Sequence, residues 1–172
     1  MSIYELEHAI FRETKTTFEL VSFEQDILAA SRLIEQARDH INIFSHNLCP
    51  AIFDTQQVIH ACEKFCLRSP HTQINILVCD SRPITRISHR LLGLSHRLPS
   101  SIAFKKIADN INPPEGDFIS LDKSAYFQLP NHQHYQAVCN FSDAGRTAQF
   151  LSFFKDAWER SETDPELRSA LL

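Results

Sequence analysis

The sequence contains few glycines. Only Gly93, Gly116 and Gly145 occur in 172 residues, whereas soluble proteins average about 7% glycine, which would give about a dozen in a chain of this length. A loop that cradles phosphate through its backbone amides needs several closely spaced glycines. The Walker and Rossmann fingerprints are therefore excluded, and so is a Gly-x-Ser-x-Gly nucleophile elbow.

The sequence also lacks a long apolar run. No stretch approaches the roughly 20 apolar residues that span a bilayer, and the acidic N-terminal residues do not form the apolar region of a signal peptide. The five cysteines are odd in number, and most of them fall on apolar faces, which is typical of reduced thiols. We therefore expect a cytoplasmic protein without a membrane span. The cysteines are Cys49, Cys62, Cys66, Cys79 and Cys139.

Positive charge is scarce as well. The chain has 17 Lys and Arg against 21 Asp and Glu, a net charge of −4. This balance argues against a protein whose main task is to wrap nucleic acid, since phosphate contacts need clustered cations. With 43% hydrophobic residues, the chain can bury one core. We expect an N-terminal arm over residues 1–17, one domain over 18–161 and a tail over 162–172.

The central part of the chain predicts the fold class. The apolar run Ile74–Cys79, the helical pattern Ile84–Leu98 and the apolar run Ile102–Ile107 form a strand, a crossover helix and a second strand. Such a connection is right-handed and makes the two strands parallel.

Similar elements precede this unit. Ser22 begins a helix as its N-cap, with Gln25 at the capping-box position, and Asp54 is expected to cap another helix in the same way. The predicted elements are a short N-terminal helix over 3–11, strands over 17–21 and 41–45, and helices over 23–39 and from 54 to about 69.

The last third of the chain changes character. Short apolar runs alternate with turn residues and have no helix between them, which indicates hairpins. A long helix follows Ser142 or Asp143 and includes Trp158. The sequence therefore predicts an α/β fold with a mixed sheet, parallel in its centre and antiparallel at one side, and with helices on both faces.

Polar residues follow two of the predicted parallel strands. Ser45, His46 and Asn47 come after one strand, and Asp80 and Arg82 come after the next. Ligands of α/β sheets bind at this carboxyl edge. These residues are therefore candidate ligand contacts, although solvated loops have the same composition.

The predicted crossover helix adds further candidates. His89 and His96, like Arg90 and Arg97, are seven residues apart and would lie near one face of a continuous helix. Arginines arranged this way suit phosphate or carboxylate, and the alternative is an ordinary solvated face. We include His89 and Arg90 among the candidate ligand contacts.

No metal site or cofactor is predicted. His60 lies on the opposite helix face from Cys62, and the pair His132 and His134 has no third ligand nearby in the sequence. No spacing of Cys, His and Asp indicates a nucleophile.

The order of elements resembles the phospholipase D-like superfamily, in particular its single-unit, nuclease-type members. The resemblance covers residues 22–161. Within it, residues 27–45 are similar to the family's first helix and strand, residues 74–80 to its strand ending in Asp, and residues 150–161 to its closing helix.

The family's signature, His-x-Lys-x-x-x-x-Asp, should fall at residues 115–122. Only Asp122 matches it, because Glu115 replaces the histidine and Asp117 replaces the lysine. The Gly-Ser segment that follows in the family reads Phe-Gln-Leu-Pro over residues 127–130. In the family the histidine is the covalent nucleophile and the lysine binds phosphate oxygens, so the resemblance implies a degenerate active site.

Three functions follow from these observations. The first is a non-catalytic phospholipase D-like domain that binds a ligand or a protein partner, with Asp122 added to the candidate contacts. The second is a hydrolase that uses His46, His89 or His96. The third is a nucleic-acid binder that uses the cations Arg82, Arg86, Arg90, Arg97, Lys105 and Lys106.

The resemblance also implies a homodimer. Single-unit members of the family pair across a two-fold axis to complete one active site. Four aromatic residues near the antiparallel strands are candidates for such an interface, and packing inside the monomer is the alternative. They are Phe118, Tyr126, Phe127 and Tyr135.

Overall fold

The computed structural model describes residues 2–169, and its strands form one mixed sheet. The strand order is β1-β7-β6-β5-β2-β3-β4. β2, β3 and β4 are parallel to one another, and β4 is an edge strand of the sheet. All other neighbouring strands are antiparallel. This mixed α/β sheet confirms the predicted fold class. The strands are β1 (Thr17–Leu20), β2 (His40–Ser45), β3 (Gln73–Val78), β4 (Ile102–Lys106), β5 (Asp117–Leu121), β6 (Ala125–Leu129) and β7 (Ala137–Asn140).

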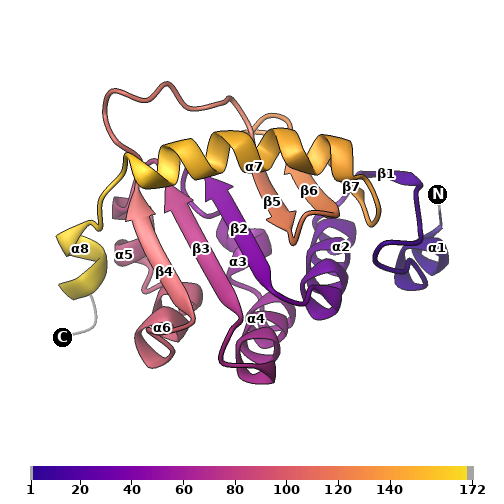
Figure 1. Cartoon of the computed structure of the whole chain (residues 1–172), viewed down its shortest axis with the longest axis horizontal. Helices are drawn as coiled ribbons and strands as arrows, with labels where there is room; N and C mark the ends of the chain where they lie inside the picture. The colour runs from indigo at the N-terminus through magenta and orange to yellow at the C-terminus, as the bar shows by residue number, and fades with distance from the viewer. Residues whose placement is uncertain (1, 170–172) are drawn as a thin grey trace.

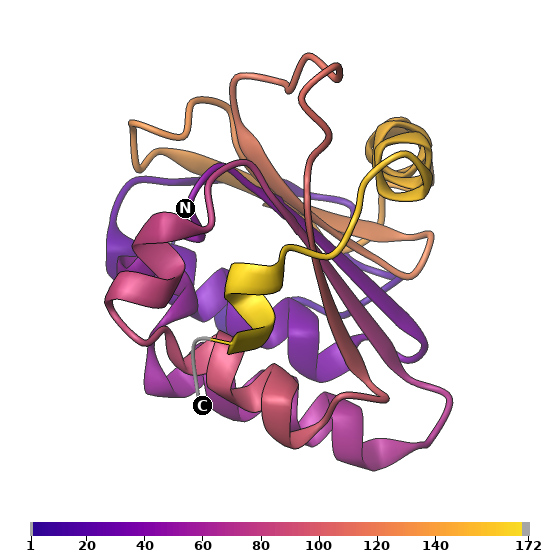
Figure 2. The same cartoon turned by 90° about the vertical axis from the view of Figure 1, so that its left-hand side faces the viewer.

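Helices cover both faces of the sheet. α7 (Ala144–Glu159) crosses one face alone, and α2 (Phe23–Gln36), α4 (Gln56–Arg68) and α6 (Arg90–Arg97) cover the other. Figure 1 shows α7 in front of the strands, and Figure 2 shows it end-on, apart from the other helices. The shorter helices are α1 (Ile3–Glu7), α3 (Pro50–Phe53), α5 (Arg82–Arg86) and α8 (Pro165–Ser169).

The period-2 alternation of the strands separates two apolar cores. Ile41 and Ile43 of β2 belong to the larger core beneath α2 and α4, whereas Phe44 belongs to the smaller core beneath α7. In β3, Ile76 and Leu77 divide in the same way. The layered structure therefore follows from residues that the sequence already places on opposite strand faces.

Two predicted helix caps are confirmed and one is wrong. The Ser22 hydroxyl accepts a hydrogen bond from the Gln25 amide, and the Asp143 carboxylate accepts one from the Arg146 amide. Asp54, however, does not cap α4, because Thr55 is its N-cap. The Asp54 carboxylate instead accepts hydrogen bonds from Arg90.

The single helix predicted over 84–98 is also wrong, since the segment forms α5 and α6. Ser88 between them has a φ of 53°, which no helix accommodates. His89 follows as the N-cap of α6, with its Nδ1 accepting from the Leu91 amide. His89 therefore lies outside the helix that contains His96, whereas Arg90 and Arg97 both belong to α6, at its two ends.

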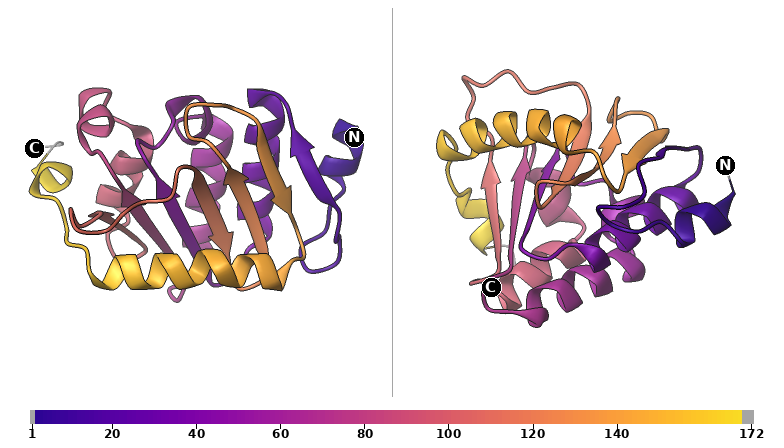
Figure 3. Two further views of the ribbon diagram at one scale, coloured as in Figure 1. Left: turned by 90° about the horizontal axis from the view of Figure 1, so that it is seen from above. Right: turned by 45° about the vertical axis from the view of Figure 1, so that its right-hand side comes forward.

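Residues at both ends of the chain join the main core. Leu6 and Phe11 pack in the larger core, as does Leu167 of α8. The Gln36 side chain bonds the backbone of Ala9 and Phe11. The predicted domain limits at residues 17 and 161 stay a prediction, and the predicted tail lies partly outside the described residues. Figure 3 shows the two ends at opposite sides of the sheet.

Two further properties concern the cysteines and the helices. All five cysteines are free thiols, and burial raises the pKa of Cys66 and of Cys79 to about 11. Of the helices in the described part of the chain, none combines the length and the apolar composition that a membrane span requires.

Candidate functional site

Ser45 and Asp117 lie side by side where β2 ends and β5 begins. The Ser45 hydroxyl donates to Asp117 Oδ2 at 2.6 Å, and the His46 amide donates to Asp117 Oδ1 at 3.0 Å. Ser45 is fully buried and Asp117 is 3% exposed. Burial raises the pKa of the Asp117 carboxyl, while these hydrogen bonds and the charges of His46 and His132 act in the opposite direction.

Two imidazoles stack beside this carboxylate. The ring centroids of His46 and His132 are 3.8 Å apart and the planes differ by 9°. His46 Nε2 bonds the Pro114 carbonyl at 2.8 Å, and His132 Nδ1 bonds the Glu115 carbonyl at 2.7 Å. Because carbonyl oxygens only accept, these nitrogens carry protons. The imidazoles therefore hold the loop between β4 and β5 against the sheet edge.

Glu115 completes this arrangement, and its carboxylate accepts a hydrogen bond from Asn131 Nδ2 at 3.0 Å. In residues 2–169, no lysine or arginine is hydrogen-bonded to or paired with Glu115 or Asp117. We name Ser45, His46, Glu115, Asp117 and His132 the edge cluster. The sequence predicts Ser45 and His46 at this edge but not His132, because the position of His132 depends on the turn after β6.

Three other predicted residues lie near the same edge. Asn47 is exposed, and the Asp80 amide donates to the His46 carbonyl at 2.9 Å. The Arg82 guanidinium donates two hydrogen bonds to the Asp80 carboxylate and the Arg82 amide donates a third, and these bonds lower the pKa of Asp80. This pair lies in an open pocket of about 520 Å³ beside the buried Ser81.

The predicted roles of His89 and Arg90 as ligand contacts do not fit their environment. His89 is 1% exposed, its Nε2 bonds the Leu48 carbonyl at 3.0 Å, and burial lowers its pKa. Arg90 is occupied by Asp54, whose carboxylate and carbonyl it bonds. Both residues therefore fasten α6 to the segment after β2.

Asp122 lies at the opposite end of the sheet from the edge cluster. Its carboxylate accepts hydrogen bonds from the amides of Arg38, Asp39 and His40 at 2.9–3.0 Å. Its own φ is 52°. The carboxylate thus joins the turn after β5 to the start of β2, a structural role that the sequence did not indicate.

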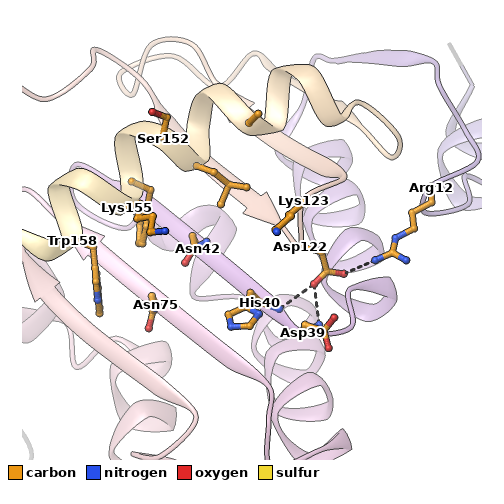
Figure 4. A pocket seen from close by; sticks show the side chains of 13 residues that line it. Arg12, Asp39, His40, Asn42, Asn75, Asp122, Lys123, Ser152, Lys155 and Trp158 are labelled. Carbon is orange, nitrogen blue, oxygen red and sulfur yellow. Dashed lines mark hydrogen bonds and ion pairs between the residues drawn. The ribbon is translucent and has the colours of Figure 1, made fainter.

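A groove of about 690 Å³ lies between α7 and the sheet. We name it the α7 groove. Asn42 and Asn75 form its floor, Trp158 of α7 lies at one end, and Arg12 and Lys123 lie at the other (Figure 4). Sequence analysis missed this groove. The available signal was the change along one strand face from Asn42 to Phe44, and from Asn75 to Leu77.

A family model described as a domain of unknown function (DUF7931) matches residues 22–170. The chain belongs to this family. No curated protein sequence matches it significantly.

The chain is similar in structure to NucT and to Nuc, a phospholipase D family member. NucT from Helicobacter pylori is 12% identical with a TM-score of 0.62, over 87% of this chain and 99% of NucT. Nuc from Salmonella typhimurium, a phospholipase D family member, is 14% identical with a TM-score of 0.59, over 86% of this chain and 96% of Nuc. The fold is therefore phospholipase D-like, as the order of elements predicted.

A longer protein has the same fold in part. TrmBL2, an archaeal chromatin protein with a novel mode of DNA binding, is 13% identical with a TM-score of 0.63 over 92% of the DUF7931 chain. The chain spans only 56% of TrmBL2. At such low identities these similarities concern the fold alone.

The DUF7931 chain shows no metal centre in its described part. Over residues 2–169, no group of three or more His, Cys, Asp or Glu side chains is arranged to hold a metal ion. The stacked imidazoles of His46 and His132 each use one nitrogen for a backbone carbonyl. The edge cluster is therefore a hydrogen-bonded arrangement of carboxylates and imidazoles.

Proposed function

We propose that this chain is a non-catalytic phospholipase D-like domain that binds a ligand or partner and does not cleave phosphodiesters. One observation supports the proposal most strongly. The resemblance aligns Glu115 and Asp117 with the signature histidine and lysine, and both belong to the edge cluster, where no described lysine or arginine contacts them.

The chemistry of the cluster opposes the family's reaction. A covalent phosphohistidine mechanism needs an imidazole at the phosphorus and a cation at the oxygens that gain negative charge. Two carboxylates at these places would repel a phosphodiester, because like charges at about 4 Å cost about 4 kcal/mol near a protein surface. Asp117 is held by Ser45 and His46, so it is not free to turn away.

A hydrolysis assay tests the proposal. Purified protein is incubated with bis-p-nitrophenyl phosphate and with a single-stranded oligonucleotide, and we expect no turnover above that of the buffer. Turnover that disappears in both His46→Ala and His132→Ala, but persists in His134→Ala, would overturn the proposal. His134 is the matched control because its exposed imidazole lies in the same turn as His132.

Such turnover would indicate the second candidate function, a hydrolase whose site residues differ from those of the family signature. The stacked pair of His46 and His132 beside Asp117 is the observation that favours it. The histidines first considered with His46 are engaged elsewhere, since His89 bonds Leu48 and His96 bonds the Leu167 carbonyl. A surviving hydrolase would therefore use the edge cluster.

Nucleic-acid binding through the predicted cations ranks lower. Arg82 is paired with Asp80, Arg90 with Asp54, and Arg97 with Glu63 at 4.0 Å. The Lys105 amine donates to the Trp158 carbonyl. Binding through phosphates would appear as a slope of about −0.9 per contact when the logarithm of affinity is plotted against that of salt concentration.

A further inference from the structure

The α7 groove exists because α7 covers only part of the sheet face. Phe44 and Leu77, beneath α7, are fully buried. Two residues earlier on the same strand faces, Asn42 and Asn75 are half-buried and open to the groove. If this region served only to extend the core, apolar residues would be expected at both positions.

The two asparagines present hydrogen-bonding groups side by side. Asn42 and Asn75 are paired in register on the neighbouring parallel strands β2 and β3. Asn75 Oδ1 accepts from Gln73 Nε2 at 3.0 Å, and Asn42 has no side-chain partner among the described residues. Both amide nitrogens are therefore available to an oxygen acceptor in the groove.

Positively charged side chains lie beside the asparagine floor of the α7 groove. Lys123 and Lys155 are exposed and form no described ion pair or side-chain hydrogen bond. Arg12 is 3.8 Å from Asp122, whose oxygens already accept three backbone amides. Asp39 is the other acid of the groove. With three cations against two carboxylates, the lining is positive in a chain with a net charge of −4.

The other side of the groove is apolar and held in place. Leu151, Phe154 and Trp158 contribute to it from α7. Trp158 stacks on Phe154, and the Lys105 amine lies 4.6 Å from the centroid of its ring. A volume of about 690 Å³ is within the range of small-molecule sites, roughly 300–1,000 Å³.

We infer that the α7 groove binds a small organic phosphate, the size of a mononucleotide or a sugar phosphate. The phosphate lies between Arg12 and Lys123, the polar body contacts Asn42 and Asn75, and the apolar side of α7 excludes water. A phosphomonoester carries a charge of about −1.5 to −2 at neutral pH, and the net positive lining therefore attracts it more strongly than a monocarboxylate. This inference rests on the proposed binding role.

Trp158 provides the measurement, because it is the single tryptophan of the chain. Its fluorescence is followed during titration with adenosine 5′-monophosphate and with ribose 5-phosphate, using adenosine and ribose as uncharged controls. We expect a saturable change with one or both phosphates and none with the controls. Saturation with only one of the two phosphates shows whether the groove prefers a nucleotide or a sugar phosphate.

Charge-reversing substitutions test whether the ligand binds in the α7 groove. Lys123→Glu and Lys155→Glu are each expected to weaken binding at least tenfold without affecting folding, since both side chains are exposed and unpaired in the described chain. Lys64→Glu is the matched control, because Lys64 is an exposed residue of α4 outside the groove.

Three results would overturn the inference. The first is that neither phosphate produces a saturable change in Trp158 fluorescence. The second is that Lys64→Glu weakens binding as much as Lys123→Glu and Lys155→Glu do. The third is that the protein binds a 20-nucleotide oligothymidylate but neither small phosphate. None of them bears on hydrolysis. Phosphodiester turnover would overturn the proposed non-catalytic role instead, so the two failures are distinguishable.

Discussion

Three aspartates show how the same side chain serves different purposes in one fold. Asp117 is buried and bonded by a serine hydroxyl, and Asp122 is buried and bonded by three backbone amides. Asp26 of α2 is also fully buried, but neither of its oxygens has a hydrogen-bond partner in the described structure. Burial raises the pKa of Asp26 from 3.8 to about 7.

Asp26 therefore makes stability depend on pH. Between about pH 4 and 7 the unfolded chain loses the Asp26 proton while the folded chain keeps it, so the free energy of unfolding falls as pH rises. Each pKa unit is worth about 1.4 kcal/mol, and the loss approaches about 4 kcal/mol by pH 8. We expect Asp26→Asn to reduce the difference in unfolding free energy between pH 5 and pH 8.

Urea unfolding at the two pH values measures this effect. Asp109→Asn, which neutralises an exposed carboxylate, is the control and should retain the wild-type difference. The same difference in Asp26→Asn as in wild type would show that Asp26 is not the cause.

At the scale of elements, the hairpin of β5 and β6 depends on a close backbone approach at Gly116. A Cβ atom at this position would lie 2.0 Å from the Leu129 carbonyl oxygen and 2.6 Å from that of Pro130. Real Cβ atoms do not approach backbone so closely. The turn that follows β6 includes His132, so the edge cluster depends on the same approach.

We expect Gly116→Ala to destabilise the protein by about 1–3 kcal/mol or more, because backbone must move to accommodate the methyl group. Gly93→Ala is the matched control. Gly93 lies in α6, and a methyl group on its Cα would meet no other atom within 4 Å, so alanine there should stabilise the helix by up to about 1 kcal/mol. Thermal unfolding of both variants checks the prediction, which fails if Gly116→Ala melts at the wild-type temperature.

At the scale of the whole molecule, the homodimer stays a prediction of the family resemblance. Of the four aromatic residues considered for its interface, Phe118, Tyr126 and Phe127 are at most 5% exposed, and Tyr135 is 50% exposed. The buried three pack inside the monomer. Of these four residues, only Tyr135 is exposed enough to contribute to an interface between two copies.

Light scattering at micromolar concentration tests the predicted pair. The chain has a mass of 19.8 kDa, so the dimer predicts about twice this value. A mass near that of one chain, unchanged on tenfold concentration, would contradict the dimer. Tyr135→Ala, compared with Tyr4→Ala on the exposed side of α1, would show whether the exposed ring contributes.

The local elements could be predicted from the sequence because their signals are local. The apolar run Ile74–Cys79, the helical period after Ser22 and the cap at Asp143 depend on neighbouring residues, and all three appear in the structure. The order of these elements then predicted the mixed sheet, since handedness and short connections allow few topologies. The phospholipase D-like fold was expected from the resemblance of this order to that superfamily.

Tertiary structure alone decided the features that join distant segments. The break at Ser88 lies next to a buried hydrogen bond between His89 and Leu48, and no periodicity reports such a contact. His132 meets His46 across 86 residues of sequence, and the α7 groove depends on where a C-terminal helix crosses strands formed much earlier. Sequence patterns record which face of an element is apolar, but the distance between two faces is set only when the elements pack.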